Sequence, residues 1–136
     1  MTEDVRSYNV GASDYSKHKY QSWDFWLTFR LNPFDADLCK RTLRTKQTDG
    51  RLLDYKKIKH ICGERIRQLN EKADVWPPHN FEVPQELFVD MIADYNLCED
   101  DELLLRNLLY NPTRIDAYAA MQSLCDKRII DLSNEA

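Results

Sequence analysis

Residues 37–69 read DLCKRTLRTKQTDGRLLDYKKIKHICGERIRQL, and this stretch decides how the chain folds. Between Lys40 and Lys59 it holds eight lysines or arginines and only two acids. Its apolar residues nevertheless recur at helical spacing, which is typical of a packed helix rather than a disordered basic tail. We therefore predict a folded, basic helical hairpin. Its crowded cations indicate an anionic ligand, a nucleic acid or an acidic partner surface.

Local signals set the limits of the hairpin's two helices. Asn32-Pro33 predicts a helix start, with the asparagine as N-cap and the proline as the first helical residue, and this helix should run to about Lys46. Residues 48–50 (Thr-Asp-Gly) predict a turn, and a long helix should follow over residues 52–71. The apolar stripe of that long helix comprises Tyr55, Ile58, Cys62, Ile66 and Leu69.

An aromatic helix over residues 19–31 should precede the hairpin. Its apolar residues at helical spacing are Tyr20, Trp23, Leu27 and Leu31. A helix this rich in aromatic residues favours burial, either in the core or in a subunit interface.

The second half of the chain follows a segment, residues 74–84, that holds three of the five prolines and predicts a linker. Three more helical patterns come after it, over residues 85–95, 100–110 and 112–130. No segment alternates as a strand would. We therefore predict an all-α fold of about six helices.

The expected organisation divides the chain into four parts. These are an N-terminal arm (1–16), a basic helical region (17–73), the linker (74–84) and an acidic helical region (85–136). The two helical regions should pack together as one domain. Residues 1–73 carry a formal charge of +5 and residues 74–136 carry −9. The acidic half is therefore expected to dock on the basic half, within one chain or between chains.

Composition excludes several functional classes. An overall charge of −4 argues against binding of extended nucleic acid, and no apolar run is long enough for a membrane span. The four cysteines have no paired spacing and indicate reduced core thiols in a cytoplasmic protein, with no metal site. Only three glycines are present, so no glycine-rich phosphate loop exists, and we assign no catalytic residue and no cofactor.

Anion binding is the chemistry that the hairpin suits best. Lys40 and Arg44 stand four residues apart on one helical face, where like charges repel unless an anion lies between them. Asp37 and Arg41 have the same spacing and should form an ion pair. The candidate phosphate-binding residues are Lys40, Arg44, Lys46 and Lys57. The candidate base-stacking or supporting residues are Tyr15, Tyr20, Trp23, Asp54 and His60.

The order of residues over 14–69 also resembles a small all-helical family of tailed phages. The positions that carry the resemblance are Asp14-Tyr15, Gln21 before Trp23-Asp24-Phe25, Ala36-Asp37, the segment from Lys40 to Arg44, and Asp54-Tyr55-Lys56-Lys57-Ile58. In the family these places hold a His-Tyr pair, an acidic residue, Gly-Asn, a Lys-Tyr-x-x-Arg segment and an Asp-Leu-x-Lys-Ala helix start. One branch of the family is a nucleotide kinase without a P-loop.

This resemblance implies a nucleotide-handling protein of bacteriophage origin. The family's histidine and acid are replaced here, which favours binding over catalysis. We expect a homo-oligomer in the host cytoplasm that binds a nucleotide or cyclic nucleotide and sequesters a host immune signal. One alternative is a nucleoside monophosphate kinase, which would need Mg²⁺. Another is an interaction module that grips an acidic host protein with the basic hairpin.

Overall fold

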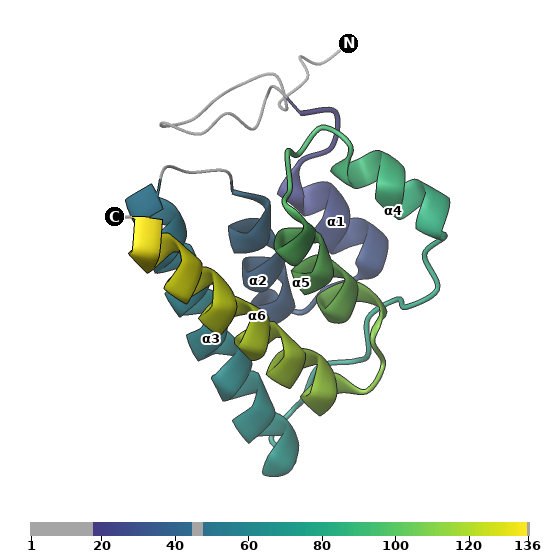
Figure 1. Cartoon of the computed structure of the whole chain (residues 1–136). Helices are drawn as coiled ribbons and strands as arrows, with labels where there is room; N and C mark the ends of the chain where they lie inside the picture. The colour runs from purple at the N-terminus through teal and green to yellow at the C-terminus, as the bar shows by residue number, and fades with distance from the viewer. Residues whose placement is uncertain (1–17, 45–47, 136) are drawn as a thin grey trace.

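The computed structural model describes residues 18–44 and 48–135, and in these residues it consists of α-helices without any strand (Figure 1). The helices are α1 (Ser22–Phe29), α2 (Pro33–Leu43), α3 (Thr48–Asn70), α4 (Gln85–Ile92), α5 (Glu99–Tyr110) and α6 (Arg114–Glu135). The predicted all-α fold is confirmed.

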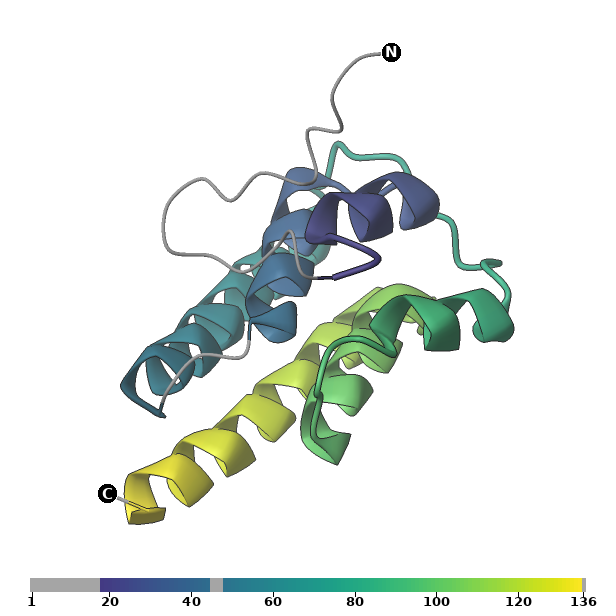
Figure 2. The same cartoon turned by 90° about the horizontal axis from the view of Figure 1, so that it is seen from above.

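The two longest helices, α3 and α6, form the frame of the molecule. They lie side by side in both views, with the end of α6 next to the start of α3 (Figures 1 and 2). Early residues of α3 meet late residues of α6, so the pair is antiparallel. The contacts that show this are Arg128 Nε to Tyr55 Oη (3.3 Å), Lys59 Nζ to Asp126 Oδ1 (2.7 Å) and Arg65 Nε to Tyr118 Oη (3.1 Å).

The start of α2 follows its sequence signal. The Asn32 side chain accepts a hydrogen bond from the backbone N–H of Asp35 at 2.8 Å, and Pro33 is the first helical residue, as predicted. This cap also fixes Asp35 in the first turn of α2. Asp35 is 1% exposed, so the helix start places a carboxylate inside the protein.

Several predicted helix boundaries are shifted: α1 is shorter than the predicted 19–31, α2 ends at Leu43 rather than at about Lys46, α4 ends at Ile92 rather than at residue 95, and α6 ends at Glu135 rather than at residue 130. Two further shifts, at the starts of α3 and α6, have an identifiable cause. Residues 48–50 are the first residues of α3 rather than a turn. The Arg51 guanidinium stabilises this junction, because it donates to the backbone oxygens of Arg41 (2.6 Å) and Thr42 (2.9 Å) at the end of α2. The helix α6 begins at Arg114 and not at Pro112, since the Asn111 side chain accepts from the Thr113 N–H (3.1 Å) in the turn before it.

The apolar residues that share a face of the predicted first helix do not form the buried face of α1. Trp23 is 40% exposed and Leu27 is 73% exposed. The fully buried side chains of α1 are Phe25 and Phe29, which stand one helical turn apart. Phe29 packs edge-on against Phe88 of α4 and Tyr110 of α5, and these aromatic contacts decide which face turns inward.

The proline-rich segment 74–84 contains no helix but packs against the core. His79 is 8% exposed and Val83 is 5% exposed. The Asn80 N–H donates to the Phe29 carbonyl at 2.7 Å, and the Tyr110 hydroxyl donates to the Val83 carbonyl at 3.0 Å. The segment therefore connects the halves as an ordered part of the domain.

The acidic half docks on the basic half within one chain, which is one of the two arrangements that the charges allowed. Arg51 Nη2 lies 2.8 Å from Asp101 Oδ2, and both side chains are less than a tenth exposed. The pair of Lys19 and Asp90 also joins the halves, at 3.2 Å. Three cysteines are buried as expected, whereas Cys98 is exposed, which corrects the prediction of four core thiols. None of the described helices is both long and apolar enough to span a membrane.

Candidate functional site

The junction of α2 and α3 brings together part of the predicted anion site. Asp54 is 2% exposed, and its Oδ1 lies 3.3 Å from Arg44 Nη1 and 3.5 Å from Arg41 Nη1. Two guanidinium groups are thus held beside one carboxylate oxygen. The other oxygen, Oδ2, is buried without a hydrogen-bond partner among the described residues. Arg44 and Asp54, two residues on which the phage-family resemblance rests, form an ion pair here.

The outer face of α2 keeps a positive charge. Arg41 Nε donates to Asp37 Oδ1 at 3.0 Å, so the predicted pair is confirmed. Within the described residues, no ion pair includes Lys40. Three cations (Lys40, Arg41 and Arg44) therefore stand against the two carboxylates of Asp37 and Asp54, which leaves a formal charge of +1.

An open groove of about 450 Å³ lies beside this face. It is lined by Trp26, Leu31, Pro33, Ala36, Asp37 and Lys40. Its apolar wall includes an indole ring whose buried N–H has no hydrogen-bond partner among the described residues. Lys40 sits in the groove lining and stands one helical turn from Arg44. A groove of this volume falls within the range of small-molecule sites.

The remaining predicted residues lie elsewhere or outside the described residues. Tyr15 and Lys46 belong to the latter group. The Tyr20 hydroxyl donates to Asp90 Oδ2 at 2.8 Å, and this hydrogen bond raises the pKa of Tyr20. Trp23 is on the exposed side of α1.

Lys57 and His60 are exposed on α3. His60 lines a separate shallow hollow of about 460 Å³ between α3 and α6, together with Lys56, Lys59 and Arg67. Lys57 does not line this hollow, so the two predicted residues are not part of one site. The structure brings Arg44 and Asp54 together, keeps Lys40 one helical turn from Arg44, and leaves His60 at another surface.

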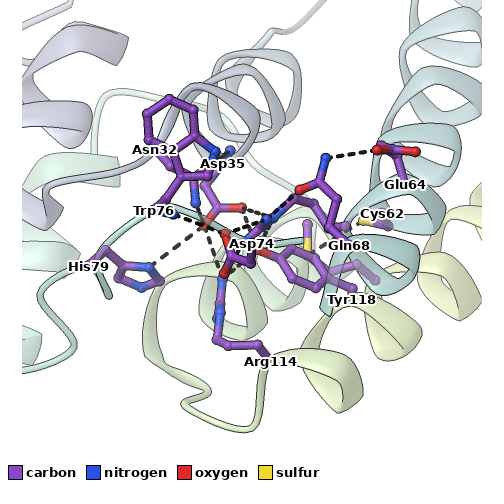
Figure 3. Close-up of polar contacts among 12 residues, drawn as sticks. Asn32, Asp35, Cys62, Glu64, Gln68, Asp74, Trp76, His79, Arg114 and Tyr118 are labelled. Atoms are coloured by element: carbon purple, nitrogen blue, oxygen red, sulfur yellow. Dashed lines mark hydrogen bonds and ion pairs between the residues drawn. The ribbon is translucent and has the colours of Figure 1, made fainter. Parts of the chain in front are cut away.

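A buried polar network centred on Asp35 was not predicted (Figure 3). The Tyr118 hydroxyl donates to Asp35 Oδ1 at 2.6 Å, and Arg114 Nη2 donates to Oδ2 at 3.3 Å. His79 Nδ1 lies 3.7 Å from Oδ2, and Arg65 Nε lies 3.9 Å from Oδ1. Four elements of the fold therefore meet at one carboxylate: α2, α3, the segment 74–84 and α6.

Arg65 extends this network toward the surface. Its guanidinium donates to both carboxylate oxygens of Asp74, at 3.1 and 3.3 Å, and to Gln68 Oε1 at 2.6 Å. The hydrogen bond from Arg65 lowers the pKa of Asp74. Burial, with the nearby Asp35 charge, raises the pKa of Tyr118 to about 12, while burial lowers the pKa of His79. At neutral pH these groups form two ion pairs and a neutral imidazole.

One sequence signal could have located part of this network. Arg65 falls on the apolar face of α3, between Cys62 and Leu69 at helical spacing. A charged residue at a core-facing position requires a buried partner. The identity of that partner follows only from the tertiary structure, since Asp35 and Tyr118 lie far away in the chain.

Among the described residues, no group of three or more His, Cys, Asp or Glu side chains could hold a metal ion. Asp90 and Asp94 accept hydrogen bonds from the segment before α1: Lys19 Nζ donates to Asp90 at 3.2 Å, and the Lys19 backbone N–H donates to Asp94 at 2.8 Å. Comparison with known proteins finds no family model, no curated protein and no solved structure that matches the chain.

Proposed function

We propose that this protein binds a phosphorylated nucleotide along the α1–α2 groove. The observation that carries the proposal is the position of Lys40, which lines the groove and stands one turn from the Arg41–Arg44 pair at Asp54. A phosphate placed beside Lys40 would gain a charge-assisted hydrogen bond from a cation that has no ion pair among the described residues.

A nucleotide needs an apolar surface for its base or sugar and a cationic donor for its phosphate, and the groove offers these at two different places. Its apolar wall, formed by Trp26, Leu31 and Pro33, offers a surface for a base or sugar. Its cationic end, at Lys40, offers a donor for phosphate. Trp26 takes the stacking role that we assigned to Tyr20 and Trp23, which do not line this groove.

Binding without transformation suits the residues that line the groove. Asp37 is the one carboxylate among them, and Arg41 already pairs with it. We therefore propose a sequestering role, with a host signalling nucleotide, cyclic or linear, as the ligand of a phage-encoded protein. The homo-oligomer and the acidic host partner stay predictions. The second of these loses support, because several cations of the hairpin are used in pairs within the chain.

The test is titration calorimetry of the full chain with a panel of cyclic and linear nucleotides, preceded by mass spectrometry of small molecules released on denaturation. Lys40→Gln should weaken binding at least about tenfold, because one charge-assisted contact is lost. Lys56→Gln is the matched control, since Lys56 is an exposed helical lysine that lines the other hollow. Equal affinities for the two variants would refute the assignment, as would the absence of binding to any nucleotide.

A further inference from the structure

A second pocket, distinct from the α1–α2 groove, opens above the Asp35 network. It is half-enclosed and has a volume of about 270 Å³. Its apolar lining consists of Trp76, Pro77, Pro78, Phe81 and Pro112, and its polar lining consists of Asn32, Asp35, Arg65, Asp74, His79 and Arg114. Figure 3 shows Trp76, Asp74, His79 and Arg114 gathered around Asp35. Aromatic and proline walls with a few convergent polar groups are typical of small-ligand sites.

The charges of this pocket are balanced. Asp35 and Asp74 offset Arg65 and Arg114, and each arginine pairs with one of the two acids at 3.3 Å or less. Burial favours the neutral form of His79, so the imidazole adds no charge at neutral pH. A ligand with a net charge would leave that charge uncompensated in a half-enclosed site. The pocket therefore suits a ligand whose own charges sum to zero.

Two groups of the network retain hydrogen-bonding capacity. Among the described residues, Arg114 uses three of its N–H donors, toward Asn111 O (2.8 Å), Asp35 Oδ2 (3.3 Å) and Tyr118 Oη (3.2 Å). A guanidinium has five such donors, so two remain. Asp74 is 22% exposed at its side chain, and its Oδ2 accepts one hydrogen bond, from Arg65. One cationic donor and one anionic acceptor thus line the same pocket.

Trp76 provides the apolar contact for such a ligand. Its side chain is 40% exposed, and it lies two residues from Asp74, whose Oδ1 accepts from the Trp76 N–H at 3.3 Å. This hydrogen bond fixes the backbone of the wall relative to the carboxylate. Phe81 lies beneath the Arg114 guanidinium, whose carbon is 5.3 Å from the ring centroid. The polar groups of the pocket and its apolar wall are therefore held in place by one connected set of contacts.

We propose that this pocket binds a small zwitterion of the α-amino acid class. The ligand carboxylate pairs with Arg114, its ammonium group pairs with Asp74, and an apolar or aromatic side chain lies against Trp76. The volume, just below the range for drug-sized ligands, fits a molecule of this size. This site shares no lining residue with the α1–α2 groove, so it is independent of the proposed nucleotide binding.

The experiment is calorimetry of the full chain with phenylalanine, leucine and serine, beside two phenylalanine analogues. These are 3-phenylpropionate, which lacks the ammonium group, and phenethylamine, which lacks the carboxylate. We expect binding of phenylalanine, with each analogue at least about tenfold weaker because one charged contact is missing. Trp76→Ala should abolish binding, whereas Trp23→Ala, the same substitution at an equally exposed tryptophan on α1, should not.

Three results would overturn the proposal. One is the absence of binding to any of the three amino acids at millimolar concentration. Another is equal binding of phenylalanine and either analogue, which would remove the zwitterion requirement. The third is unchanged affinity in Trp76→Ala with circular dichroism confirming its fold. Because nucleotides are titrated separately, failure here leaves the groove proposal standing, and failure of the groove proposal leaves this one standing.

Discussion

The hydroxyl of Tyr118 offers the sharpest test of the buried network. It donates to Asp35 Oδ1 at 2.6 Å and accepts from Arg65 Nε at 3.1 Å and Arg114 Nη2 at 3.2 Å. Hydrogen bonds to charged groups contribute about 1.5–3 kcal/mol each. The arginines keep other acceptors, so the loss in Tyr118→Phe falls mainly on the buried carboxylate. We expect the free energy of unfolding to fall by about 2–4 kcal/mol.

The matched control is Tyr110→Phe. Its hydroxyl is also a donor to a partner across the fold, but that partner is the neutral Val83 carbonyl, at 3.0 Å. We expect a loss of about 0.5–1.5 kcal/mol for this variant. Urea unfolding, followed by far-ultraviolet circular dichroism, measures the free energy of unfolding of both variants. If Tyr118→Phe costs no more than Tyr110→Phe, Asp35 does not depend on this hydroxyl and our account of the network is wrong.

Three further predictions use other sites. His79 has a lowered pKa, because of its burial, so below its ordinary value of 6.5 the unfolded chain binds a proton that the folded chain does not. Stability should therefore fall with decreasing pH by up to about 1.4 kcal/mol per pH unit, a component that His79→Asn should remove in urea unfolding from pH 7 to 5. Gly63→Ala should stabilise the protein by about 0.5–1 kcal/mol in the same assay, since its added Cβ meets only the end of the Gln122 side chain, at 3.3 Å. Cys98 should react with a thiol reagent in the native protein, and the three buried cysteines should react only after unfolding.

The sequence predicted the helical architecture because its signals are local. The Asn32-Pro33 start depends on a cap within one turn, and the pair of Asp37 and Arg41 depends on spacing within one helix. Such features form wherever the helix forms. The turn predicted at residues 48–50 was wrong for a non-local reason, because the Arg51 guanidinium binds the carbonyls at the end of α2.

The candidate site was predictable only in part, for the same reason. Lys40 and Arg44 share a face by helical spacing, but the partly buried ion pair of Arg44 with Asp54 requires α2 and α3 to pack together. The Asp35 network requires four segments to meet. The local sequence of any one segment does not identify the residues that it will contact in the others. The inward face of α1 was also undecidable locally, since aromatic residues lie on several of its faces and only packing against Phe88 and Tyr110 selects one.

Ion pairs within the chain account for much of the positive charge of the basic hairpin. Several of its cations form ion pairs with other parts of the chain and are therefore not free to bind a ligand. These pairs are Arg44 with Asp54, Arg51 with Asp101, and Lys59 with Asp126. This matters for any test of anion binding. Removing Arg44 would leave a buried carboxylate short of a partner, and a loss of binding would then be indistinguishable from a loss of fold. Lys40 has no ion pair among the described residues, so a change in affinity on its substitution reports on the ligand.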